Sequence, residues 1–246
     1  GSNNTATGRS TLGANTTGAC NTTMGQGSLN SNTTGATNTA FGYLALSTNT
    51  TADNNTAVGV SALEDNTTGY SNTAVGKFTA QCNTEGFDNA AFGSAALQKN
   101  TTGDNHTAIG NQALRCNTTA SNNSGLGYKA LCRNTTGSDN TAVGHGALAI
   151  TTTGSTNIAV GVSSLGSHTT GANNTGVGGA VGYELTTGSN NLLLGKDAGR
   201  AASPSGALTT QSNRIVLGNN SITNAYIKVA WTVTSDLRDK TNFGTV

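Results

Sequence analysis

Hydrophobic and polar positions along the chain recur with a period of seventeen residues. The segment Asn55–Gly59 (Asn-Thr-Ala-Val-Gly) returns as Asn72–Gly76, and its relatives run from residues 4–8 to residues 191–195. Numbered from this Asn, the seventeen places have the consensus Asn-Thr-Ala-Val-Gly-x-x-Ala-Leu-x-x-Asn-Thr-Thr-Gly-x-x. A register this regular predicts stacked copies of one small unit and not a single globular core.

Each unit is too short for a helical hairpin, so the pattern predicts β-structure. The fourth place is large and apolar in nearly every copy, as in Val58 and Phe92, and the ninth is usually Leu, as in Leu63. We expect two short strands per unit, at places one to four and eight to eleven, and a rung that buries one Val, one Leu and two Ala. The predicted fold is all-β: a parallel β-solenoid (β-roll) of about twelve 17-residue rungs with a β-rich C-terminal cap.

Glycine holds the fifth place in every unit. A turn is needed directly after the first strand, and Gly accepts positive φ there without steric cost. We therefore assign a structural turn role to the fifth-place glycines Gly25, Gly42, Gly59, Gly76, Gly93, Gly110, Gly127, Gly144, Gly161 and Gly178.

Asparagine dominates the first place. In a parallel stack, identical residues lie above one another about 4.8 Å apart, so twelve rungs make a rod roughly 55 Å long. We expect the side-chain amides to hydrogen-bond up and down this stack. The predicted ladder comprises Asn38, Asn55, Asn72, Asn89, Asn140 and Asn157, and His106 takes the same place once.

Little apolar surface is available in each rung to offset the entropy of ordering seventeen residues. Small third and eighth places, such as Ala57 and Ala62, permit close approach of two backbones. We therefore expect a multimer, most simply a homotrimer of three parallel chains about one axis. A single-chain solenoid that fills its own core is the alternative.

Charge excludes several classes of partner. Charged residues are 9% of the chain and the net charge is +1, so no basic field is present to bind nucleic acid or an anionic membrane. No apolar run has the length of a membrane span. The leading pair Gly1-Ser2 is typical of a scar left by tag removal. No cofactor is expected.

The cysteines and histidines lie at several different places of the repeat. Cys116 and Cys132 fall on adjacent rungs, at places eleven and ten, where a disulfide is geometrically feasible and two reduced thiols are the alternative. His106, His145 and His168 occupy three different places, so they form no column. No zinc spacing occurs, and we expect no metal site.

The register changes near the C-terminus. The last recognisable unit, Arg214–Gly218, follows its predecessor by twenty-three residues, so six residues are inserted. Beyond it, the alternation through Ile222, Tyr226 and Trp231 predicts strands. We divide the chain into the tag scar at 1–2, the solenoid shaft at 3–200, and a cap and junction at 201–246.

Over residues 3 to about 200, the units resemble the Asn-Thr-Ala-Val-Gly repeats of phage tail fibres and of tail-fibre-like bacterial surface proteins, which are related in pattern to the heads of trimeric autotransporter adhesins. The resemblance implies a homotrimeric, extracellular shaft, in a virion tail or a surface fibre, that contributes to host attachment. It also implies a host-surface glycan or protein receptor as a partner, and repeats that are not catalytic.

The segment Thr234–Phe243 resembles the start of the intramolecular chaperone domain of endosialidase-type tail spikes. In that family a Ser-Asp-x-Arg-x-Lys motif marks self-cleavage, which implies Ser235, Asp236 and Lys240 as candidate self-processing residues. We expect cleavage only in a longer chain that carries the chaperone, and intact-mass comparison with Ser235→Ala would test it. A solvated charged tail is the alternative.

Two other functions compete with the fibre hypothesis. Stacked Thr columns such as Thr56, Thr73 and Thr107 could present a hydroxyl array, as in an ice- or surface-binding solenoid. A polysaccharide-cleaving tail spike is the other, although aromatic residues are only 4% of the chain and no carboxylate pair recurs. Receptor contacts are expected at the variable loop places: Tyr70, Lys77, Phe87, Asp104, Tyr128 and His145.

Overall fold

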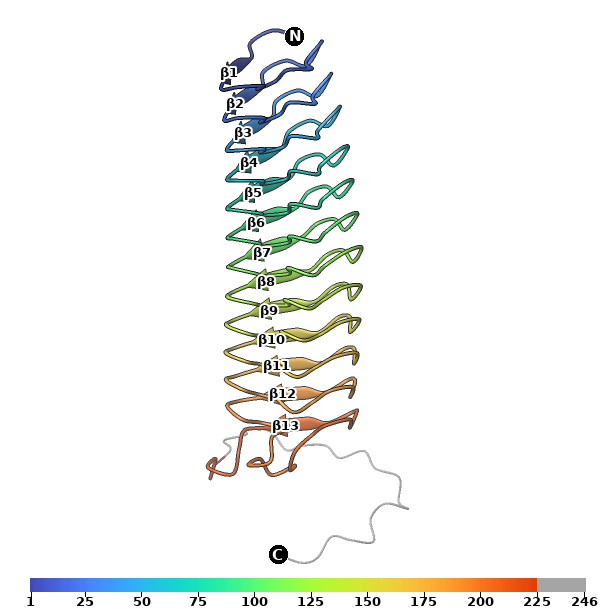
Figure 1. The fold of residues 1–246 in the computed structure, drawn as a ribbon. Coiled ribbons are helices and arrows are strands. Elements are labelled where there is room, and N and C mark those ends of the chain that lie inside the picture. Colours follow the sequence, from blue (N-terminus) through green and yellow to red (C-terminus); the bar gives the residue numbers. More distant parts are fainter. Residues whose placement is uncertain (225–246) are drawn as a thin grey trace, which may run out of the picture.

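The computed structural model describes residues 1–224 and forms a straight stack of similar turns, with β1 at one end and β13 at the other (Figure 1). Thirteen three-residue strands form one parallel sheet in sequence order. The strands are β1 (Thr5–Thr7), β2 (Thr22–Met24), β3 (Thr39–Phe41), β4 (Thr56–Val58), β5 (Thr73–Val75), β6 (Ala90–Phe92), β7 (Thr107–Ile109), β8 (Ser124–Leu126), β9 (Thr141–Val143), β10 (Ile158–Val160), β11 (Thr175–Val177), β12 (Leu192–Leu194) and β13 (Ile215–Leu217). The predicted all-β parallel solenoid is confirmed.

Neighbouring strands pair in strict register. Thr56 lies opposite Thr73, and Val58 opposite Val75, one unit further along the chain. The register survives the six-residue insertion, because Leu192 of β12 pairs with Ile215 of β13. The sheet therefore continues beyond residue 200, and the inserted residues form a bulge closed by a hydrogen bond from the Leu208 N–H to the Gly199 carbonyl at 2.8 Å.

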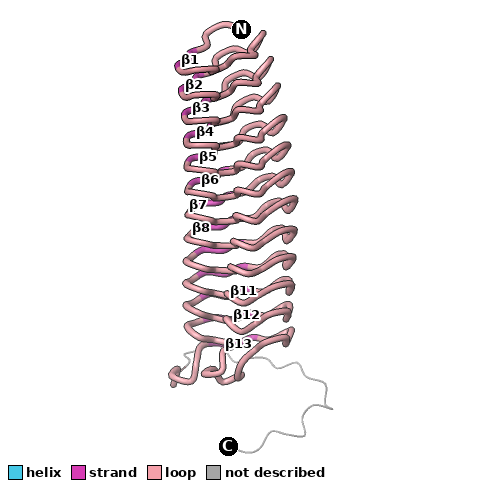
Figure 2. The backbone as a smooth tube through the Cα atoms, in the orientation of Figure 1, coloured by secondary structure: helices cyan, strands magenta, loops and turns pink. Residues whose placement is uncertain are grey.

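Each turn contains one strand and not the two that the pattern predicts (Figure 2). Places seven to eleven form a second wall whose backbone is not extended, because its seventh and ninth residues have positive φ. Lys129 has a φ of 57°, Leu114 one of 51° and Leu131 one of 52°. Hydrogen bonds nevertheless join this wall from rung to rung, as from the Leu114 N–H to the Ala130 carbonyl at 2.9 Å.

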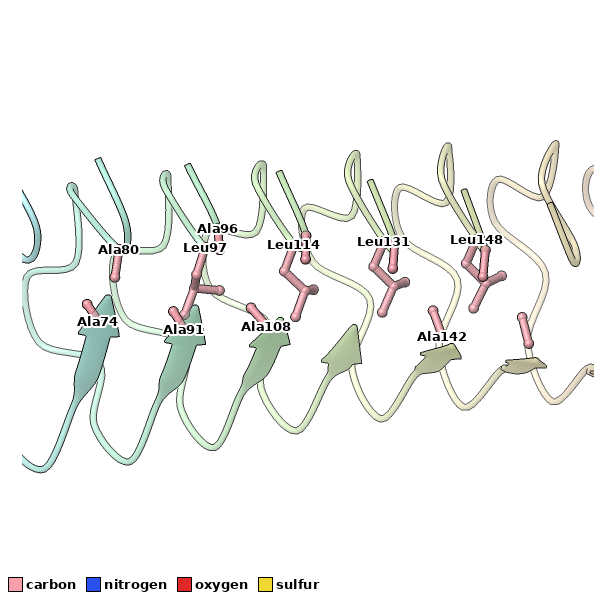
Figure 3. Packing of buried hydrophobic residues seen from close by; sticks show 14 of the residues in the cluster. Ala74, Ala80, Ala91, Ala96, Leu97, Ala108, Leu114, Leu131, Ala142 and Leu148 are labelled. Atoms are coloured by element: carbon pink, nitrogen blue, oxygen red, sulfur yellow. The ribbon is translucent and has the colours of Figure 1, made fainter. Parts of the chain in front are cut away.

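The core lies between the strands and the second wall. Figure 3 shows Leu97, Leu114, Leu131 and Leu148 projecting from the second wall toward the strand side, where Ala91 and Ala108 face them. All of these side chains are fully buried. A single chain therefore fills its own core.

The expectation that each rung buries its fourth-place residue is wrong for the single chain. Successive side chains of a strand point to opposite faces. The third-place Ala57 is fully buried, whereas Val58 beside it is only partly covered and Val143 is 36% exposed. The fourth-place side chains consequently lie on the outside of the solenoid.

Candidate functional site

An apolar stripe runs along the outer face of the sheet. It is formed by the fourth-place side chains, which stack because the strands are in register. Exposed members reach 56% at Met24, 39% at Phe92 and 47% at Leu217. We call this surface the outer stripe; its exposed members are Met24, Phe41, Phe92, Ile109, Val143, Val160, Val177, Leu194 and Leu217. A continuous apolar surface of this kind is typical of a protein contact.

Threonine occupies the other outward place of most strands. Thr56, Thr73, Thr107 and Thr141 are all partly exposed and belong to one column, in which Ala90 and Ser124 are interposed. The adjacent outward column is the outer stripe. The sheet thus presents an interrupted column of hydroxyl groups beside one column of bulky apolar groups.

The fifth-place glycines have the turn geometry predicted for them. Gly59, Gly76 and Gly144 have φ values of 136°, 135° and 132°. A Cβ on Gly76 would lie 2.8 Å from the backbone carbon of Gly93 and 2.7 Å from Thr79 Oγ1. Conformation and space therefore both require glycine at this place.

The first-place asparagines form a buried ladder, but its main bonds differ from the expected amide-to-amide pairs. The Asn72 N–H donates to Asn55 Oδ1 at 2.9 Å, and Asn55 Nδ2 donates to the Gly69 carbonyl at 2.9 Å. The predicted members Asn38, Asn55, Asn72, Asn89, Asn140 and Asn157 are at most 3% exposed. Direct amide pairing appears near the C-terminal end, as from Asn157 Nδ2 to Asn140 Oδ1 at 3.1 Å.

A second asparagine ladder lies at the twelfth place and is not among the residues predicted to form a ladder. Asn66 Nδ2 donates to Asn49 Oδ1 at 3.0 Å and to the Gly69 carbonyl at 2.8 Å. The signal was present in the sequence, because Asn holds this place in eight successive units from Asn15 to Asn134. The two ladders satisfy the buried backbone groups at the Asn-Thr-Thr-Gly turns.

His106 replaces asparagine in the first-place ladder. Its Nδ1 accepts from the Asn123 N–H at 3.2 Å, so Nε2 carries the proton and donates to the Ala120 carbonyl at 2.7 Å. Burial lowers the pKa of His106. The imidazole is therefore neutral and structural, as expected for a ladder histidine.

His168 lies in the second ladder and is also fully buried. Its Nε2 accepts from Asn174 Nδ2 at 3.2 Å, and its Nδ1 faces Thr151 Oγ1 at 3.4 Å. Burial lowers the pKa of His168 to about 4. Within residues 1–224, no three His, Cys, Asp or Glu side chains gather where they could hold a metal ion.

The cysteines are free thiols. Cys116 and Cys132 lie on adjacent rungs as expected, and the Cys116 N–H donates to the Cys132 carbonyl at 3.1 Å, but no disulfide joins them. The structure therefore has the reduced alternative. Burial raises the pKa of the Cys132 thiol against the opposing influence of Arg115.

The variable loop places bring aromatic rings together in two positions. Tyr70 and Phe87 stack with ring centroids 4.9 Å apart, and Tyr128 and His145 stack at 5.2 Å. Lys129 Nζ lies 5.0 Å from the centre of the Tyr128 ring. The sequence predicted the four ring-bearing residues Tyr70, Phe87, Tyr128 and His145 as contact positions individually but predicted neither their stacking nor the position of Lys129.

A hollow of about 430 Å³ lies on the second wall and was not predicted from the sequence. We call it the basic hollow; its lining includes Gln112, Arg115, Lys129, Cys132, Arg133 and Ile150. A signal was present, since three basic residues fall between positions 115 and 133 of a chain with only twelve Lys and Arg. These three residues occupy three different places of the seventeen-residue unit, so the consensus sequence of the unit does not show that they cluster.

Carboxylates meet in another hollow, of about 160 Å³, where Arg200 pairs with both of them. Arg200 Nη1 lies 2.7 Å from Asp197 Oδ1, and Arg200 Nε lies 3.7 Å from Glu184 Oε1. Two carboxylates that both pair with one guanidinium do not have the arrangement of the acid and base pair of a glycoside hydrolase.

The candidate self-processing residues Ser235, Asp236 and Lys240 lie outside the described residues, as do Tyr226 and Trp231 of the expected cap strands. The described residues contain no helix, and therefore none long enough to cross a membrane. Scans against protein-family models, curated proteins and solved structures find no significant match to this chain.

Proposed function

We propose that this chain is the structural and adhesive shaft of an extracellular fibre, of the phage tail-fibre or tail-fibre-like surface type, and that it acts as a parallel homotrimer. The outer stripe is the observation that carries the proposal. Its exposed members recur on the same face from Met24 to Leu217, over almost the whole length of the described stack.

The geometry of the outer stripe supports a parallel assembly. Because the stripe runs along the stack on one face, two or more chains aligned in the same direction bury it along their full length. An antiparallel pair would oppose different side chains at each level. The number three comes from the resemblance to trimeric fibres, and closure about one axis leaves the second wall of each chain exposed to solvent.

The filled core of the single chain changes which side chains the proposed trimer would bury. Leu63 and its equivalents are already buried within one chain, so association is not needed to cover them. The trimer instead buries the outer stripe and leaves the basic hollow and the stacked aromatic pairs available for a host glycan or protein receptor. The shaft itself is not an enzyme in this proposal.

An ice-binding function is supported less well by the outer face of the sheet. Thr56 and its stacked equivalents fill one outward column, but the second column carries Phe41, Phe92 and Leu126. Side chains of such unequal size do not make a flat array. Thermal hysteresis of a freezing solution is the measurement that would favour this function over the fibre.

The assembly is tested by charging the outer stripe. Val143→Glu is expected to reduce the mass in sedimentation equilibrium from three chains to one while β-sheet circular dichroism is retained, because a carboxylate would be buried in the trimer contact. Thr136→Glu is the control, since Glu85 naturally holds the same fourteenth place and Thr136 is exposed. A trimer that persists in Val143→Glu would contradict the stripe as its interface.

A further inference from the structure

We propose that the basic hollow binds the anionic group of an acidic saccharide. Its volume of about 430 Å³ is that of a site for one or two sugar rings. The saccharide as the source of the anion rests on the proposed adhesive function, whereas the anion site itself follows from the residues of the hollow alone.

Three cationic side chains share this hollow without a described anionic partner. Arg115, Lys129 and Arg133 line it, and no carboxylate is among its lining residues. Across residues 1–224, the ion pairs involve only Arg200. In a chain with a net charge of +1, this clustering makes a local positive field that a bound oxyanion would neutralise.

Hydrogen bonds between rungs of the second wall fix the backbone from which these side chains extend. The Lys129 N–H donates to the Asn111 carbonyl at 3.0 Å, and the Arg133 N–H donates to the Ala149 carbonyl at 3.1 Å. Arg115 is half-buried at the hollow, and its covered Nε has no hydrogen-bond partner in the described part of the chain. Its planar guanidinium suits the oxygens of a carboxylate, sulfate or phosphate.

Aromatic rings beside the hollow favour a sugar over a simple ion. Tyr128 is 43% exposed, stacks on His145, and is connected to the hollow by Lys129, whose Nζ lies 5.0 Å from the ring centre. The apolar face of a sugar ring packs well on such side chains. The chain has only twelve Lys and Arg among its 246 residues, which argues against a long polyanion such as nucleic acid.

Calorimetric titration of the whole chain with three ligands tests the site: inorganic phosphate, a glucuronate-containing tetrasaccharide, and a neutral tetrasaccharide of N-acetylglucosamine. We expect the acidic tetrasaccharide to bind at least about tenfold more tightly than phosphate, and the neutral one not to bind. Arg115→Gln and Arg133→Gln are each expected to weaken binding by about tenfold or more, because each removes a charge-assisted hydrogen bond. Lys196→Gln, which removes one charge outside the hollow, is the control.

Arg133 is exposed, so its variant is expected to fold even where Arg115→Gln does not, and circular dichroism of each variant checks this. Equal affinity for phosphate and the acidic tetrasaccharide would mean an adventitious ion only and would overturn the proposal. Unchanged binding by a folded Arg133→Gln would overturn it as well. Because the oligomeric mass is measured separately, failure of this site is distinguishable from failure of the fibre proposal.

Discussion

Individual residues in this solenoid are selected by stacking, because each one lies directly on its equivalent in the next rung. Gly76 shows this most clearly: its φ of 135° disfavours a side chain, and a Cβ there would lie 2.8 Å from the backbone carbon of Gly93. The neighbour is backbone and cannot move aside without disturbing its own rung.

Gly76→Val is therefore expected to destabilise the fold by more than about 1 kcal/mol, through backbone strain and displacement of the next rung. Chemical denaturation monitored by circular dichroism measures this. Gly179→Val is the matched control, because a Cβ on Gly179 has no neighbour within 4 Å. Equal stability of the two variants would show that the turn does not require glycine.

Acid is expected to weaken the fold through His168. Its folded-state pKa of about 4 is below the ordinary value of 6.5, so the folded state favours the neutral ring. This contribution is complete above pH 6.5 and is lost as the pH falls from 6.5 toward 4, by up to about 3 kcal/mol. His168→Asn, with the residue usual at that place, should be less sensitive over this window when urea midpoints are compared at pH 7 and pH 4.5. An equal loss in both proteins would exclude His168 as the cause.

At the scale of the element, the two walls of the solenoid differ in how far the sequence predicted them. The strand wall was predicted well, because Thr-Ala-Val has ordinary strand propensity and a fixed Gly follows it. Its inward and outward faces are not predicted correctly, because the size of Val58 suggests burial whereas the smaller Ala57 faces the core.

The second wall could not be predicted as it is. Leu114 and Leu131 have positive φ, which an isolated Leu avoids. Contacts between rungs hold them there: the N–H of Leu114 bonds to the next rung while its side chain is fully buried. The basic hollow is lined by residues of this second wall, so it could not be predicted without the conformation of that wall. The stacking of Tyr128 on His145 likewise depends on a spacing that only the folded backbone provides.

Leu114→Asp tests how strongly neighbouring rungs depend on one another. A carboxylate in this fully buried column is expected to destabilise the fold by at least about 3 kcal/mol and to expose the adjacent rungs to hydrogen exchange. Thr119→Asp introduces the same charge at an exposed place of the same rung and should leave exchange unchanged. If the rungs next to the Leu114→Asp substitution remain protected from hydrogen exchange, the stability of one rung does not depend on its neighbours, and the prediction is wrong.

The whole molecule is a stack in which every rung contacts chiefly its two neighbours, and the register holds even across the insertion between β12 and β13. The seventeen-residue period was sufficient to predict this architecture. It was not sufficient to predict how chains associate. The small apolar surface of each rung suggested that a rung needs a partner chain to cover its core, but one chain fills that core by itself. The outer stripe is the feature that now supports association.

Light scattering coupled to size exclusion, at micromolar concentration, tests the trimeric shaft most directly. We predict a single species with three times the chain mass of 24.4 kDa. A folded species with the mass of one chain, 24.4 kDa, would contradict it and would leave the outer stripe exposed to solvent.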